Sequence, residues 1–125
     1  MALKYNKVLL KVSGEALMGD QGFGIDPATV SRISNDIKEG IGLGAKVALV
    51  VGGGNIFRGV ALAAQGADRV SGDHMGMLAT VMNAIAIRMA LVESGVPAVV
   101  LSALEMAEVC ETFTQRSAEK YMADG

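Results

Sequence analysis

Three consecutive glycines, Gly52-Gly53-Gly54, follow an apolar run from Val47 to Val51. An uninterrupted aliphatic run of this length is typical of a strand that is buried on both faces in a parallel sheet. Glycines at the end of such a strand leave backbone N–H groups bare, so an anion can approach them closely. Arg58 follows shortly after and could close over a bound phosphate with its guanidinium donors. The alternative interpretation is a plain glycine-rich turn between a strand and a helix.

A second candidate for phosphate chemistry lies at the end of the first predicted strand, residues 7–12. Lys11 is followed by Val12 and by the pair Ser13-Gly14, which ends the strand. Ligands of open α/β sheets bind at the carboxyl ends of strands, where a lysine can stabilise the charge of a transferring phosphoryl group. A lysine that simply extends into solvent is the competing interpretation. The neighbouring Ser-Gly and triple-glycine turns favour the phosphate role.

Asp73 and His74 precede a long apolar segment, residues 75–92. Asp73 has two interpretations: it caps the following helix, or it accepts hydrogen bonds from ligand hydroxyls near the glycine turn. His74 is the only histidine and Cys110 the only cysteine. We interpret His74 as a cap or packing residue. Without a cluster of cysteine, histidine and carboxylate side chains, the sequence predicts no metal site made by the chain itself.

The elements that must position these residues follow from hydrophobic spacing. Asp26 is predicted to cap a helix that starts at Pro27 and presents apolar residues on one face as far as Ile41. A second strand is expected over residues 46–51, so the chain forms a strand–helix–strand unit, which is right-handed in nearly all proteins. The later elements predicted are a helix over 75–92, a buried strand over 98–101 and a helix over 115–122 capped by Thr114. The fold class is therefore α/β.

Composition limits the classes of function. The chain has 125 residues, enough for one domain over 1–125, and a net charge of −2 with no basic run, which argues against nucleic-acid binding. No signal peptide is recognisable, and the longest apolar stretch without charge, residues 75–87, is short for a bilayer span. A single cysteine fits a reducing compartment. We therefore expect a cytoplasmic protein that does not bind membranes.

Two further segments suggest interactions. The 75–92 segment is apolar nearly all round with Arg88 as its only charge, so we expect it to be buried between copies of the chain. The contacts expected there are Met77, Leu78, Met82, Ile85 and Met89. The second segment is a glycine-rich loop, and a lid, a subunit contact and an ordinary surface loop all remain open for it. Its residues are Gly19, Asp20, Gln21, Gly22, Phe23 and Gly24.

Taken together, the motifs resemble the bacterial uridylate kinases of the amino-acid kinase family. The K-x-S-G-E motif at 11–15 and the G-G-G-N motif at 52–55 are shared with the wider family, which includes acetylglutamate, glutamate, aspartate and carbamate kinases. The D-H-M-G-M-L-A-T-x-M-N segment at 73–83 is typical of the uridylate branch. The resemblance covers the whole chain. It implies a three-layer α/β/α fold with a mostly parallel sheet sandwiched by helices, present here as its N-terminal, UMP-side portion.

This resemblance also implies a reaction, in which the γ-phosphoryl group of ATP is transferred to UMP to give UDP, with Mg²⁺ accompanying ATP. Gly53 would meet the UMP phosphate and Asp73 the ribose hydroxyls. The 19–24 loop would belong to a region linked with activation by GTP, UTP would inhibit, and the intact protein would be a hexamer built from dimers. ATP contacts would come from Lys11, Val12, Ser13, Gly14, Gly54 and Arg58, with Lys11 and Arg58 catalytic.

Members of the family are much longer than this chain. The resemblance therefore implies an N-terminal fragment that lacks the segment closing on UMP and the half holding adenine, and that has little or no kinase activity. Three alternatives stay open: a nucleotide- or anion-binding module without catalysis, a mere oligomerisation domain, and a sibling kinase acting on a carboxylate or carbamate.

Overall fold

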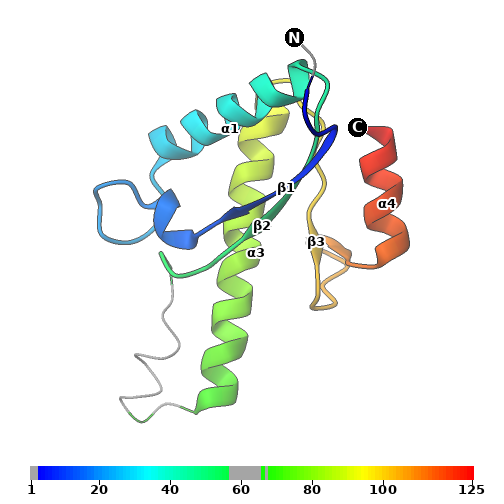
Figure 1. Ribbon diagram of the computed structural model, residues 1–125. Helices are drawn as coiled ribbons and strands as arrows, with labels where there is room; N and C mark the ends of the chain where they lie inside the picture. Colours follow the sequence, from blue (N-terminus) through cyan, green and yellow to red (C-terminus); the bar gives the residue numbers. More distant parts are fainter. Residues whose placement is uncertain (1–2, 57–65, 67) are drawn as a thin grey trace.

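The computed structural model describes residues 3–56, 66 and 68–125. Strands and helices alternate in its first half, and two short strands and a helix follow the longest helix (Figure 1). In chain order the elements are β1 (Lys7–Val12), the short 3₁₀ helix η1 (Gly14–Leu17), α1 (Pro27–Gly42), β2 (Lys46–Val51), α3 (Arg69–Glu93), β3 (Leu101–Ser102), β4 (Glu111–Thr112) and α4 (Gln115–Asp124).

β1 and β2 pair in parallel, with Lys7 opposite Lys46 and Val12 opposite Val51. The two strands therefore start and end at the same level, and their carboxyl ends form one edge. α1 connects them, which confirms the predicted strand–helix–strand unit and the α/β class. η1 was not predicted.

α1 begins as the sequence indicates, with Asp26 at the N-cap and Pro27 in the first turn. The Asp26 carboxylate makes no cap bond to a backbone N–H, because it accepts the hydroxyl hydrogen of Thr29 instead. The apolar face of α1 packs against α3, and the aliphatic side chains between them form the core. Its buried members are Leu17, Val30, Ile37, Ile87, Leu91 and Val96.

α3 starts earlier than the apolar pattern predicts. Asp68 is its N-cap, and its carboxylate accepts hydrogen bonds from the Ser71 backbone N–H at 3.0 Å and hydroxyl at 2.8 Å. The prediction that residues 71–74 precede the helix is therefore wrong, because a cap at Asp68 lets the polar first turns continue into the apolar run. By length and composition alone, this 25-residue helix could cross a membrane. One side of it contacts α1, β2 and η1, while only 28% of its apolar window is buried.

Two expectations about buried strands need correction. β2 is half-buried rather than buried on both faces, and Val50 is 49% exposed. The strand expected over 98–101 is only Leu101–Ser102, paired in parallel with β4. Residues 96–100 run without a paired strand. In the described part of the chain, β2 pairs only with β1 and β3 pairs only with β4.

The unfilled space between β2 and β3 is a groove of about 710 Å³. α3 forms one wall, and α4 and residues 96–104 form the other, on the side where Figure 1 shows β3 and α4. Its lining is mainly aliphatic, including Val47, Leu49, Val81, Ala84 and Val100. α4 is held beside it by the Lys46 ammonium, which donates to the Ala123 carbonyl at 2.9 Å. The predicted Thr114 cap of α4 is confirmed as a capping box with Ser117.

Candidate functional site

The triple-glycine turn and the end of β1 touch backbone to backbone. The Gly52 N–H donates to the Val12 carbonyl at 2.9 Å, which extends the parallel ladder by one bond. A Cβ built on Gly14 would lie 2.5 Å from Gly54 N, and one built on Gly52 would lie 3.0 Å from Gly14 N. Real Cβ atoms do not approach as closely as the Gly14 distance, so glycine is required there, and at Gly52 a side chain would fit only if the neighbouring backbone shifted. This close packing of the two turns gives the glycines a structural reason that is independent of any ligand.

α3 closes the other side of the turn. A Cβ on Gly53 would lie 2.9 Å from both the Ala79 Cβ and the Gly76 carbonyl oxygen. The turn is therefore held between the Ser13-Gly14 segment and the middle of α3. No described residue accepts a hydrogen bond from the Gly53 N–H. A bare backbone donor at the carboxyl end of parallel strands suits an anion.

Two asparagines that sequence reasoning gave no role hold the turn from beneath. Asn83 of α3 is fully buried and Asn55 is 2% exposed. Their side-chain amides bond reciprocally, with Asn83 Nδ2 to Asn55 Oδ1 at 2.7 Å and Asn55 Nδ2 to Asn83 Oδ1 at 3.1 Å. Asn83 also donates to the Gly52 carbonyl at 2.7 Å. The sequence did contain one indication: Asn83 is a polar residue inside the apolar 75–92 segment, and a buried amide needs a polar partner.

The 19–24 loop reaches the same place. Asn55 donates from its side chain to the Gly24 carbonyl at 2.8 Å and accepts from the Gly24 N–H at 2.7 Å through its own carbonyl. Gly19, Gly22 and Gly24 all have positive φ, which permits the tight path of the loop. Asp20 and Gln21 are exposed, and Phe23 is 75% exposed. The loop is thus anchored at one end and presents an apolar side chain to solvent.

Lys11 lies at the same edge, opposite Val50 and one residue before the end of β1. Its side chain is exposed. The Glu15 carboxylate, which sequence reasoning did not assign, lies against the turn: a Cβ on Gly54 would be 3.2 Å from Glu15 Oε1. Its place in the K-x-S-G-E motif was the signal. The edge therefore combines a cation, a carboxylate and glycine amides.

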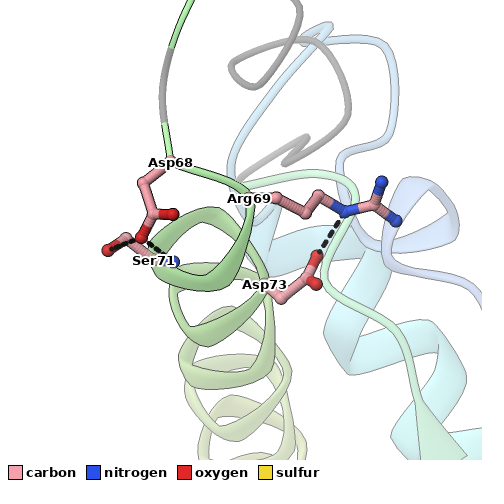
Figure 2. Close-up of polar contacts among 4 residues, drawn as sticks. All are labelled: Asp68, Arg69, Ser71 and Asp73. Atoms are coloured by element: carbon pink, nitrogen blue, oxygen red, sulfur yellow. Dashed lines mark hydrogen bonds and ion pairs between the residues drawn. The ribbon is translucent and has the colours of Figure 1, made fainter.

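Asp73 is an exposed residue of α3 whose Oδ1 lies 3.2 Å from the Arg69 Nε (Figure 2). It does not cap the helix, because Asp68 does. Asp73 lies one helical turn before Gly76, which packs on Gly53, so its carboxylate is on the side of α3 that leads to the turn. His74 is exposed, and it neither caps the helix nor packs in the described core.

Hydrogen bonds from Ser71, first from its hydroxyl and then from its backbone N–H, lower the pKa of the exposed Asp68 carboxyl. Arg58, the other proposed cation, lies outside the described residues. Within 3–56, 66 and 68–125 no group of three or more His, Cys, Asp or Glu side chains could hold a metal ion.

Comparison with known proteins assigns the family. The model of the amino acid kinase family matches residues 6–125. The chain belongs to the amino acid kinase family. It is 62% identical over 121 residues to the uridylate kinase of Brucella abortus, covering 97% of this chain and 50% of that protein. It is 59% identical over 125 residues to the uridylate kinase of Bartonella bacilliformis, covering 100% and 52%.

Two solved structures share the fold. The UMP kinase of Bacillus anthracis superposes with a TM-score of 0.89 at 32% identity, covering 96% of this chain and 50% of that one. The UMP kinase of Ureaplasma parvum gives a TM-score of 0.87 at 29% identity, covering 98% and 52%. These neighbours confirm the α/β fold. The chain spans about half the length of the curated relatives it matches.

Proposed function

We propose that this chain is the N-terminal portion of a nucleoside monophosphate kinase that transfers the γ-phosphoryl group of ATP to UMP. One observation carries the proposal: the ends of two parallel strands meet with glycine backbones in contact and with Lys11 at the same edge. The similarity to uridylate and UMP kinases over nearly the whole chain supports this choice of substrate.

Phosphoryl transfer requires alignment of the groups and neutralisation of charge, and little covalent chemistry from the protein. In our proposal the Gly53 N–H binds the UMP phosphate. Val12, Ser13, Gly14 and Gly54 line the ATP phosphates from the backbone, and Lys11 stabilises the charge that develops during transfer. Arg58 would add a second cation. No general base is needed.

Mg²⁺ would enter with ATP in this proposal. The described part of the chain offers no three-ligand cluster, but the Glu15 carboxylate lies beside Gly54. Mg²⁺ commonly takes one or two carboxylates together with substrate phosphates and water. The donor set therefore fits a metal shared between Glu15 and ATP. When bound, Mg²⁺ would neutralise phosphate charge, which would also offset the repulsion between Glu15 and ATP.

Asp73 would bind the ribose of UMP. A carboxylate is an acceptor that can take hydrogen bonds from neighbouring ribose hydroxyls. The exposed Arg69–Asp73 pair leaves the second carboxylate oxygen available, and an exposed ion pair of this kind is easily rearranged. The Asp73 carboxylate can therefore exchange its ion-pair partner for a sugar without a large cost.

We further propose that the isolated chain has weak or no kinase activity. The edges of β2 and β3 that face each other are unpaired. The groove between them has a volume of about 710 Å³ and a mainly aliphatic lining that nothing in the described chain covers. Since the relatives are about twice as long as the part matched here, their remaining half is the natural source of the strand that would fill it. Binding without turnover is accordingly the second candidate function for this chain.

α3 also supports self-association. Met75, Leu78, Met82, Ile85, Met89 and Val92 recur at alternating spacings of three and four residues, which is the pattern of a helix–helix seam. Most of them are exposed, Met82 at 55% and Met89 at 61%. We propose a homodimer through this face and a hexamer in the intact protein. We also propose activation by GTP and inhibition by UTP. We expect the protein to be cytoplasmic and to bind neither membranes nor nucleic acids.

Calorimetric titration with UMP and with ATP, followed by a coupled assay for UDP, tests the function. For the chain as it stands we expect binding with turnover far below that of an intact uridylate kinase. Co-expression with the second half of the Brucella abortus uridylate kinase should raise turnover. Ordinary turnover by the chain alone would refute the fragment proposal. Binding of neither nucleotide would refute the phosphate site and leave the oligomerisation alternative.

A further inference from the structure

The buried Asn55–Asn83 pair uses all of its amide hydrogens. Asn83 donates one to Asn55 and one to the Gly52 carbonyl, and Asn55 donates one to Asn83 and one to the Gly24 carbonyl. The partners are 28 residues apart in sequence, and neither side chain reaches solvent. A buried polar network that is fully satisfied fixes one arrangement of the backbones it joins.

The first arm of this network, the hydrogen bond from Asn83 to the Gly52 carbonyl, sets the direction of the Gly53 N–H, which we propose binds the anion. In a planar trans peptide the carbonyl oxygen and the following N–H point in opposite directions. Asn83 holds the Gly52 carbonyl towards α3 at 2.7 Å. The Gly53 N–H, which belongs to the same peptide unit, must therefore point away from α3. The absence of a partner for that N–H among the described residues agrees with this direction.

The second arm, formed by the hydrogen bonds between Asn55 and Gly24, holds the 19–24 loop. Gly24 is clamped by two hydrogen bonds, both to Asn55. Because Asn55 directly follows the glycine turn and its amide is shared with Asn83, the loop cannot shift without disturbing the support of Gly52. The reverse also holds, because coupling between two sites is reciprocal.

We propose that the Asn55–Asn83 pair is a positioning device that aims the Gly53 N–H at a bound phosphate and couples the phosphate site to the 19–24 loop. This inference rests on the proposed function for the identity of the anion, and on the described geometry for the coupling. Neither asparagine is a catalytic residue, because both act through the backbone of other residues.

Two variants of one residue separate the arms. Asn83→Asp keeps an oxygen that can accept from the Asn55 amide but loses the donors to Gly52 and to Asn55 Oδ1, whereas the near-isosteric Asn83→Leu also loses the acceptor. Asn35→Asp, on the exposed face of α1, is the matched control. Three quantities are measured on the 125-residue chain: the Gly53 amide chemical shift, the hydrogen-exchange rate of the Gly24 N–H, and the affinity for UMP by calorimetry.

Both Asn83 variants should shift the Gly53 amide resonance and weaken UMP binding by about tenfold, the effect of one lost hydrogen bond to a preorganised amide. Asn83→Leu should also raise Gly24 exchange by about tenfold, although Asn83 does not touch the loop, while Asn83→Asp, which keeps the acceptor for the Asn55 amide, should raise it less. In the unaltered chain, UMP should slow Gly24 exchange. Because UMP could also slow exchange by stabilising the whole fold, the decisive result is that this protection is lost in an Asn83→Leu variant that still binds UMP.

Unchanged UMP affinity in a folded Asn83→Asp variant would overturn the positioning role. Unchanged Gly24 exchange in Asn83→Leu, or no effect of UMP on that exchange, would overturn the coupling. If circular dichroism shows that Asn83→Leu is unfolded, the positioning role is decided by the Asn83→Asp variant. The coupling is then decided by the effect of UMP on Gly24 exchange. If the unaltered chain binds no UMP, the proposed function fails, and the Gly53 shift and Gly24 exchange decide the inference without ligand.

Discussion

At the scale of single residues, the candidate site depends on glycines, which have no side chain, as much as on Lys11. A Cβ on Gly14 or Gly53 would collide with neighbouring atoms, and one on Gly52 would lie in tight contact with the Gly14 backbone. This close contact brings the ends of β1 and β2 together and leaves the Gly53 N–H without a described partner. Lys11 adds the one described cation at this edge to which we assign a role in transfer. Two predictions belong to this scale.

The first prediction concerns Lys11. When the chain is co-expressed with the second half of the Brucella abortus uridylate kinase, Lys11→Ala should lower turnover on the order of 10²–10³-fold, by analogy with the loss of one preorganised donor. Lys7→Ala, on the same strand at the far end from the turn, is the control and should have little effect. Steady-state UDP formation measures both. Normal turnover in Lys11→Ala would show that Lys11 does not stabilise the transferring group.

The second prediction concerns Gly53. Gly53→Ala places a methyl group 2.9 Å from Ala79 Cβ and the Gly76 carbonyl, so it should destabilise the fold by about 1–3 kcal/mol through overpacking and abolish measurable UMP binding. Gly40→Ala is the control, because nothing lies within 4 Å of its Cβ. It sits near the end of α1 and should stabilise by up to about 1 kcal/mol. Urea denaturation and calorimetry measure the two effects, and equal behaviour of the variants would contradict the packing argument.

At the scale of elements, α3 connects every part of the site. Its cap region carries Asp73, its middle packs on Gly53 through Gly76 and Ala79, and Asn83 supports the turn from the next part of the helix. The early start at Asp68 brings Asp73 into the helix and orders it relative to the glycine turn. The cap should therefore matter for the stability of this end of the molecule.

A third prediction follows from the lowered pKa of Asp68. Because this carboxyl has a lower pKa in the folded than in the unfolded chain, its ionised form stabilises folding above its ordinary pKa, near 3.9. That contribution is lost as the pH falls through the lower folded-state pKa. Asp68→Ala should therefore lower the melting temperature at pH 7, and the difference should shrink in acid. Circular dichroism melts across pH, with Asp36→Ala as an exposed control on α1, measure it. A difference that does not depend on pH would exclude the charged cap.

At the scale of the whole molecule, two apolar surfaces remain uncovered: the groove between β2 and β3, and the exposed seam of α3. Contiguous apolar surface of this kind usually marks an interaction site. We assign the groove to the half of the relatives' length that this chain does not match, and the seam to a second copy of the chain.

The fourth prediction tests the seam. Met82→Lys places a charge in the middle of the α3 face, where Met82 is 55% exposed, and should shift the chain from dimer to monomer at micromolar concentration. Val109→Lys, at a similarly exposed valine away from α3, should leave the dimer intact. Light scattering after size exclusion gives the mass. The seam is not an interface if the unaltered chain is already monomeric, or if the two variants behave alike.

The sequence by itself determined what depends on local patterns. The limits of β1, β2 and α1, the Thr114 cap and the glycine turn all follow from hydrophobic spacing and from residues with fixed backbone preferences, and the motifs indicated the family. The parallel register of β1 and β2 then required Lys11 and the glycines to share an edge.

Only the tertiary structure decided the rest, because it depends on contacts between residues distant in sequence. The Asn55–Asn83 pair joins positions 28 residues apart, and no periodic pattern marks the two as partners. The exposure of β2 depends on which elements cover the faces of its sheet, and the length of β3 depends on its pairing with β4. Asp68, and not Asp73, caps α3, because the Asp68 carboxylate lies within hydrogen-bond distance of the Ser71 donors.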